Sequence, residues 1–140
     1  LVKILEDEKI NKIFHFARFD IAVIKHFLKA NVKNIYCTKL ASKIARTYTD
    51  KHSLKDLVKE IIGLDMNKQM QSSDWGAEKL SEKQLKYAAS DVIHLHALKK
   101  ELNKMLIREK RDFLFQECLK FLNTRVDLDL ADYKNDIFSH

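Results

Sequence analysis

The chain contains no proline and only two glycines, Gly63 and Gly76, so it has few of the residues that commonly interrupt regular structure. A sequence of 140 residues with so few interruptions is expected to be mostly helical. Its two cysteines, Cys37 and Cys118, are too far apart to form a CxxC-type site. Both stand among apolar residues, and we expect them to pack as small hydrophobic side chains in a reducing compartment.

Long apolar runs are absent as well. No stretch approaches the ~18 apolar residues that a membrane span requires, and the N-terminus shows no signal-peptide pattern. These absences argue against a membrane protein and favour a cytoplasmic location. What the chain does carry is positive charge, with a formal net charge of +6 and a pI near 9.2. A basic surface suits a polyanionic partner such as nucleic acid, although lysine-rich surfaces also serve solubility.

Hydrophobic spacing divides the chain into short strands and longer helices. Short strands are predicted at 12–16 and 34–37, with a helix between them that runs through Ala30. Further helices are predicted from the cap Thr38 to about 48, from Ser53 to Gly63, from Ser81 past Leu102, and over 111–122. Two strands joined by a helix form a βαβ unit that is seldom stable without more strands. We expect one domain over 1–140 with an incomplete sheet.

The first chemical signature is the segment IFHFARFD at residues 13–20. Asp20 follows a predicted strand and falls in the first turn of a helix, where peptide N–H groups favour an ionised carboxylate. A carboxylate at that place can bind a hard cation directly or through water. An isolated acid in a first turn is more often a simple helix-stabilising residue.

The second signature pairs Tyr87 with Asp91 on the long helix. The two residues are one turn apart, so a phenol and a carboxylate share one helix face. A carboxylate there can hold a metal while the phenol orients a metal-activated water. The spacing alone is weak because chance helices produce it often. Its context is more specific: residues 80–92 read LSEKQLKYAASDV, and Ser72-Ser73-Asp74-Trp75 precedes them.

These two segments resemble motifs II and III of the ribonuclease D branch of the DEDD 3′-5′ exonucleases. The resemblance implies an α/β ribonuclease H-like fold with a helix-rich C-terminal portion. It also implies two Mg²⁺ or Mn²⁺ ions, RNA with a single-stranded 3′ end as substrate, and nucleoside 5′-monophosphates as products. By the same resemblance Asp20 and Asp91 are metal ligands and Tyr87 is the water-orienting catalytic residue. DNA as substrate, or a non-catalytic nucleic-acid-binding remnant, are the alternatives.

Motif I of that family, an Asp-x-Glu pair on a strand, has no counterpart in these residues. We therefore expect an N-terminally truncated exonuclease domain, inactive by itself and completed by an N-terminal segment. Asp127 and Asp129 are a candidate replacement, because residues 126–130 alternate like a strand and both acids would share one face. The resemblance instead makes this region a structural tail.

Phosphate contacts are predicted from basic residues. Arg108, Lys110 and Arg111 form a cluster between two predicted helices, and a plain helix-junction surface is the alternative explanation. Arg46 and Lys68 are weaker candidates for nucleic-acid binding.

Overall fold

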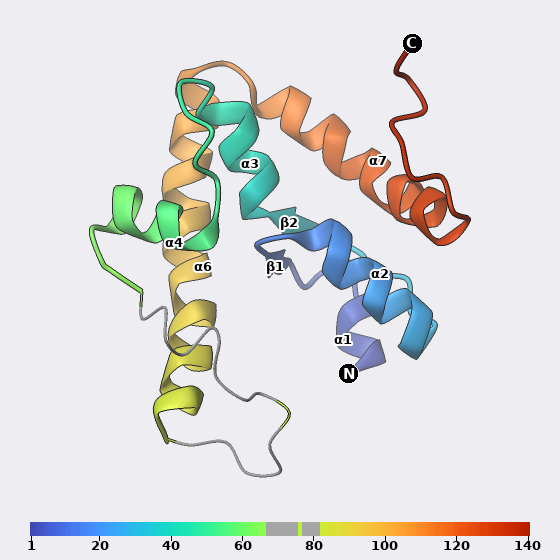
Figure 1. Ribbon diagram of the computed structural model, residues 1–140, viewed down its shortest axis with the longest axis horizontal. Coiled ribbons are helices and arrows are strands. Elements are labelled where there is room, and N and C mark those ends of the chain that lie inside the picture. The colour runs from blue at the N-terminus through green and yellow to red at the C-terminus, as the bar shows by residue number, and fades with distance from the viewer. Residues whose placement is uncertain (67–75, 77–81) are drawn as a thin grey trace.

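The computed structural model describes residues 1–66, 76 and 82–140, and for 83–91 it describes the backbone only. The elements are α1 (Val2–Glu6), β1 (Lys12–Phe14), α2 (Ala17–Leu28), β2 (Ile35–Cys37), α3 (Thr38–Ala45), α4 (Leu54–Leu57), the π-helix η1 (Val58–Ile62), α6 (Glu82–Arg108) and α7 (Asp112–Leu130). Figure 1 shows the long α6 helix at one side, α2 and α7 at the other, and the strands between them. None of the described helices is long and apolar enough to cross a membrane.

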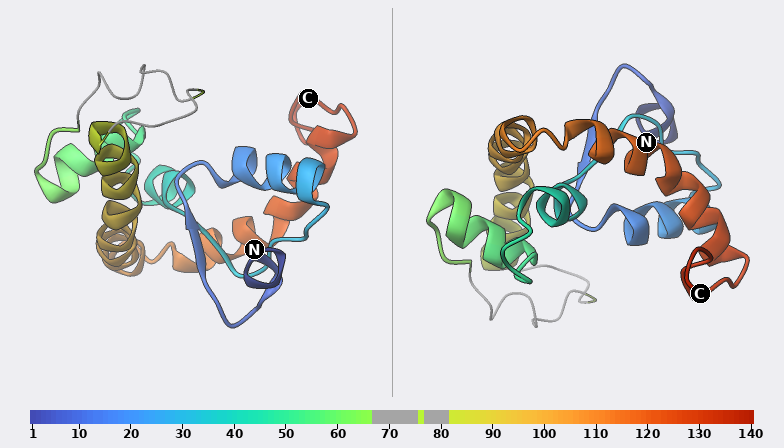
Figure 2. Two further views of the ribbon diagram at one scale, coloured as in Figure 1. Left: turned by 90° about the horizontal axis from the view of Figure 1, so that it is seen from below. Right: turned by 90° about the horizontal axis from the view of Figure 1, so that it is seen from above.

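In the described part of the chain the sheet has two parallel strands, with Ile13 opposite Tyr36. The crossover through α2 makes the predicted βαβ unit. Successive side chains of a strand point to opposite faces. Accordingly, Ile13 packs on the α6 side of the sheet and Phe14 packs on the α2 side. Helix α2 also runs beside α7, as both views in Figure 2 show.

Two groups of buried side chains hold these layers together. The first, called the α6 core, comprises Tyr36, Ala41, Ala45, Leu57, Val58, Leu98, Leu102, Leu106 and Phe115. The second, called the α2 core, comprises Leu5, Ala17, Ile21, Val32, Cys37, Leu122 and Val126. Leu40 and Leu119 pack against both cores and so connect them. Each fully buried leucine contributes roughly 1.5–3 kcal/mol relative to an exposed one.

Helix ends follow local sequence signals. The Ser53 hydroxyl accepts the Asp56 N–H at 3.1 Å, and Gly63 ends η1 with a left-handed φ of 83°, as predicted. The cap of α3 differs from expectation, because Cys37 Sγ accepts the Leu40 N–H at 3.5 Å. Thr38 instead donates its hydroxyl to the Phe14 carbonyl across the sheet at 3.3 Å.

Three expectations about residue environment are wrong. Residues 126–130 are the end of α7 and form no strand; the buried Leu122 and Val126 are four residues apart, a helical spacing that places both in the α2 core. Cys37 is buried, but Cys118 is exposed on α7. The apolar spacing of residues 85–102 predicts Val92 on the inward face of α6, yet Val92 is 60% exposed; among the side chains of α6 that the structure describes, the first buried one is Leu98.

Candidate active site

Asp20 lies in the first turn of α2, as the sequence predicts. The helix begins three residues after β1 because Phe16 is its N-cap, and the Phe16 carbonyl accepts the Asp20 N–H at 3.3 Å. The carboxylate is partly buried, and burial raises its pKa above the usual value. A nearby cation would favour the charged form and offset that cost. Asp20 thus presents a carboxylate in the first turn of the helix that follows β1.

His15 joins the elements around this strand end. Its Nδ1 lies 3.0 Å from Thr38 Oγ1, and its carbonyl accepts the Lys39 N–H at 3.1 Å and the Cys37 thiol at 3.3 Å. Burial, reinforced by the charge of Lys39, lowers the pKa of the ring to about 4. The imidazole is therefore neutral at pH 7 and fixes the start of α3 against the end of β1.

Tyr87 and Asp91 both lie within α6, four residues apart. Helix α6 packs against β1, the strand that leads to Asp20. The backbone thus places motif III on a helix that contacts the strand of motif II. The side chains of Tyr87 and Asp91, together with Lys68 and the segment Ser72-Ser73-Asp74-Trp75, lie outside the described residues.

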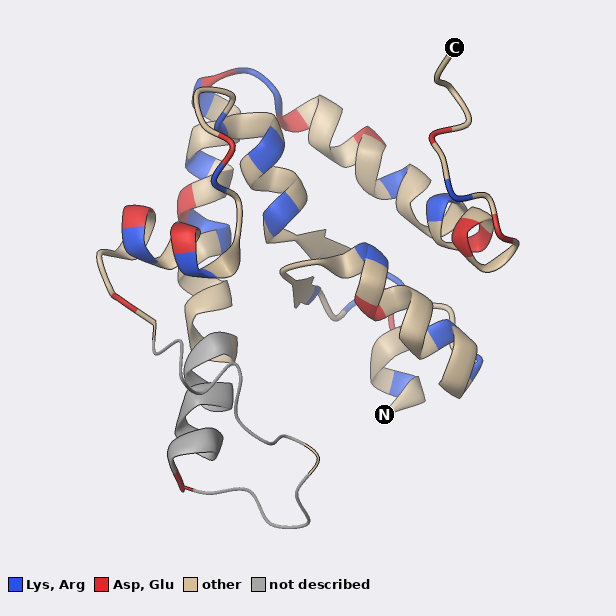
Figure 3. Cartoon of the chain, viewed as in Figure 1, with Lys and Arg blue, Asp and Glu red and all other residues tan. Residues whose placement is uncertain are grey.

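The basic candidates occupy different environments. Figure 3 shows the charged residues of the α6–α7 junction, where Arg108 and Lys110 are exposed. Arg111 donates to the carbonyls of Ile44 and Ala45 at 3.2 and 3.4 Å, so it also caps the end of α3. Of these three, Arg108 and Lys110 are the more available to a phosphate.

Arg46 is 1% exposed, and this argues against the predicted phosphate contact. Its guanidinium donates to Ser42 Oγ at 3.0 Å and to the Lys51 carbonyl at 3.1 Å, and it forms an ion pair with Glu60. A buried guanidinium with this many partners holds the loop after α3 against η1. The sequence around Arg46 does not predict an ion pair with Glu60, which is fourteen residues away.

The alternative metal pair, Asp127 and Asp129, is also not formed. Both residues lie in α7 and bind α2: Asp127 pairs with Lys25, and Asp129 accepts from Arg18 Nε and Nη2, each at 2.6 Å. Arg18 lowers the pKa of Asp129, mainly through this hydrogen bond. Among the described residues there is no group of three or more His, Cys, Asp or Glu side chains that could hold a metal ion.

Comparison with known proteins decides the family. A sequence model of the 3′-5′ exonuclease family matches residues 1–107. The chain belongs to this family. Ribonuclease D of Gluconacetobacter diazotrophicus is 33% identical over 108 residues, covering 77% of this chain and 27% of that protein. DNA polymerase I of Aquifex aeolicus is 34% identical over 116 residues, covering 76% of this chain and 19% of that protein. The chain thus spans between about a fifth and just over a quarter of the length of these curated relatives.

The fold is confirmed by a solved relative, Brucella melitensis NrnC, with a TM-score of 0.92 and 51% identity over 99% of this chain and 68% of that chain. NrnC structures with bound Mg²⁺ and with bound pGG match this chain as well. The helix-rich α/β architecture and the ribonuclease D resemblance expected from the two signatures are both confirmed.

Proposed function

We propose that this chain forms the catalytic part of a 3′-5′ exoribonuclease of the ribonuclease D type. It would hydrolyse RNA from a single-stranded 3′ end and release nucleoside 5′-monophosphates. The match of residues 1–107 to the exonuclease family carries the proposal. The location of Asp20 in the first turn of α2, and of Tyr87 and Asp91 within α6, supports it. The ribonuclease D relatives and the pGG-bound NrnC favour RNA as the substrate.

Asp20 and Asp91 are the residues that would hold Mg²⁺ or Mn²⁺. Carboxylate oxygens are the ligands these hard cations prefer, and a cation beside the partly buried Asp20 would stabilise its charged form. The Mg²⁺-bound NrnC supports the same choice of metal. When bound, the ions would supply a water of lowered pKa and stabilise negative charge. Two carboxylates are too few for two such ions. We expect an Asp-x-Glu strand beside β1 to supply the remaining ligands.

Tyr87 would act on the attacking water and not on the RNA. Its hydroxyl would hydrogen-bond that water and orient it toward the scissile phosphorus. A phenol one turn before Asp91 can do this only while helix α6 keeps its place against β1. The contacts of Leu98, Leu102 and Leu106 in the α6 core provide that support.

The test uses a chimera with the motif I strands of a close relative placed ahead of Leu1, assayed on a labelled oligoribonucleotide. Asp91→Asn should nearly abolish mononucleotide release because it removes a charged ligand. Tyr87→Phe should reduce kcat by roughly 10²–10⁴ while RNA binding stays nearly unchanged. The exposed residues Asp65 and Tyr133 provide matched controls, Asp65→Asn and Tyr133→Phe, which should keep full activity.

Two results would contradict the proposal. If Tyr87→Phe is as active as its parent, the tyrosine does not orient the water, and the Tyr-x-x-x-Asp spacing reflects helix packing. If Asp91→Asn retains activity, Asp91 is not a metal ligand. The 140-residue chain without added strands should show negligible Mg²⁺-dependent release, since its sequence has no Asp-x-Glu pair.

DNA is the second candidate substrate, because DNA polymerase I of Aquifex aeolicus is among the relatives. Discrimination depends on contacts to the 2′-hydroxyl. The same chimera should therefore be given ribo- and deoxyribo-oligonucleotides of one sequence. Faster cleavage of the deoxyribo-oligonucleotide would replace RNA by DNA in the proposal and leave the roles of Asp20, Tyr87 and Asp91 unchanged.

A further inference from the structure

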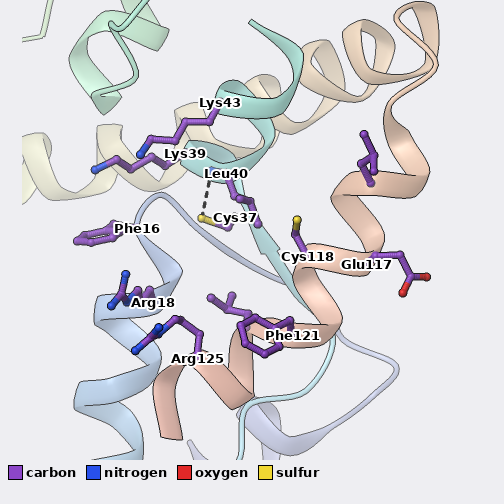
Figure 4. Close-up of a pocket in the computed structure, with 12 residues that line it drawn as sticks. Phe16, Arg18, Cys37, Lys39, Leu40, Lys43, Glu117, Cys118, Phe121 and Arg125 are labelled. Atoms are coloured by element: carbon purple, nitrogen blue, oxygen red, sulfur yellow. Dashed lines mark hydrogen bonds between the residues drawn. The ribbon is translucent and has the colours of Figure 1, made fainter. Parts of the chain in front are cut away.

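A cavity of about 620 Å³ lies between α2, α3 and α7. Small-molecule sites commonly measure 300–1,000 Å³. Its lining, shown in Figure 4, does not include Asp20 or His15, so it is separate from the candidate active site. The two sites are nevertheless neighbours, because Phe16 and Arg18 of the lining belong to the same end of α2 as Asp20.

The lining is apolar in one part and cationic in another. Its apolar lining residues are Phe16, Leu40, Leu114, Phe121 and Leu122, together with both cysteines. Its cations are Arg18, Lys39, Lys43 and Arg125, and its carboxylate is Glu117. Figure 4 shows Lys39 and Lys43 extending from α3 on the same side of the cavity as Phe16. A ligand of this cavity therefore needs both an apolar body and negative charge.

The ion pairs show which cations remain uncompensated. Arg18 and Arg125 share Asp129, at 2.6 and 3.2 Å, and Glu117 pairs with Lys120 at 2.9 Å. Lys39 and Lys43 form no ion pair with any carboxylate of the described residues; Lys39 Nζ instead lies 4.3 Å from the centroid of the Phe16 ring. The two arginines share one carboxylate and so keep one net positive charge, and Lys39 and Lys43 add two more that have no carboxylate partner among the described residues. A phosphomonoester carries about −1.5 to −2 at pH 7, which matches the two lysines.

We propose that this cavity binds a nucleoside 5′-monophosphate, with its phosphate at Lys39 and Lys43 and its base against the apolar lining. A fatty acid would use the apolar surface but carries only one charge. Inorganic phosphate would use the lysines and leave the apolar surface empty. The assignment stands on the cavity alone. Its identification as a site for the reaction product rests on the proposed function.

The binding test uses the 140-residue chain in a chelator, so that no metal-dependent site contributes. Equilibrium dialysis with GMP and AMP should show saturable binding. Guanosine, inorganic phosphate and decanoate should each bind at least tenfold more weakly than GMP. Lys43→Gln should weaken GMP binding about tenfold, because one charge-assisted contact to the phosphate is lost. The exposed Lys104 on α6 provides the matched control, Lys104→Gln, with unchanged binding.

Addition of Lys39→Gln to Lys43→Gln should weaken binding further, and circular dichroism confirms that each variant is folded. The proposal is overturned if GMP shows no saturable binding, if guanosine binds as tightly as GMP, or if Lys43→Gln and Lys104→Gln behave alike. Tighter binding of decanoate would assign the cavity to a lipid anion instead. The binding test does not measure nuclease activity. Its result on GMP binding therefore stays valid even if the proposed exonuclease reaction is disproved.

Discussion

His15 should make the stability of this protein depend on pH. Burial, together with the charge of Lys39, holds the pKa of its ring at about 4 in the folded chain, whereas an unfolded histidine titrates near 6.5. Below pH 6.5 the unfolded chain therefore binds a proton that the folded chain does not. By linkage, stability falls as the pH drops from about 6.5 to about 4, and this contribution levels off below pH 4.

The size of the effect follows from the two pKa values. The difference between 6.5 and about 4 corresponds to about 3 kcal/mol, and we expect about 2–3 kcal/mol because part of the ring meets water. Against a typical domain stability of roughly 5–15 kcal/mol, such a loss is easily measured. Other groups titrate in the same range, so the effect of His15 must be isolated by comparison.

Urea unfolding, followed by far-ultraviolet circular dichroism, should be measured from pH 7.5 to 4 for the parent chain and for His15→Gln. Glutamine can bond to Thr38 but has no proton to titrate. The free energy of unfolding of the parent should fall about 2–3 kcal/mol more than that of the variant. Parallel curves for the two proteins, or a ring pKa near 6.5 by NMR titration, would refute this account of His15.

The remaining predictions concern charged side chains. Arg46→Ala should lower the free energy of unfolding in urea by about 3–5 kcal/mol, because it breaks a buried ion-pair network. Lys33→Ala on the surface should lower it by less than about 0.5 kcal/mol. A loss below about 1 kcal/mol for Arg46→Ala would contradict its buried role. Asp129 and Arg18 should show a coupling of about 1 kcal/mol in a double-mutant cycle, reduced in 1 M salt; equal coupling at low and high salt would oppose this. Lys110→Ala should weaken RNA binding in fluorescence anisotropy and reduce the log–log salt slope by about 0.7, and an unchanged slope would remove Lys110 from the interface.

Sequence reasoning located most elements because their signals are local. The cap at Ser53 and the left-handed Gly63 depend on a few neighbouring residues, and both are found where predicted. The same holds for the βαβ unit around α2, where the hydrophobic spacing and the turn before Asp20 determine the element order.

The errors arise where distant residues decide. Asp127 and Asp129 alternate with apolar residues like a strand, yet they bind Lys25 and Arg18, which are more than one hundred residues away in sequence. From the sequence, Arg46 is expected to be an exposed basic residue after a helix. In the structure it is buried and forms an ion pair with Glu60. The residues next to each side chain in the sequence do not indicate its ion-pair partner. In both cases the side chain forms an ion pair within the fold, where the local sequence had predicted a metal ligand or a phosphate contact.

The division into two cores makes the spacing of the proposed metal ligands a property of the whole fold. Asp20 stands on a helix anchored in the α2 core, whereas Asp91 stands on a helix anchored in the α6 core. The distance between the two carboxylates therefore depends on what joins the cores, namely the sheet and the shared residues Leu40 and Leu119. A substitution at Leu40 or Leu119 would thus weaken metal affinity although neither residue is a proposed metal ligand. Selection for catalysis would then act on residues that look purely structural.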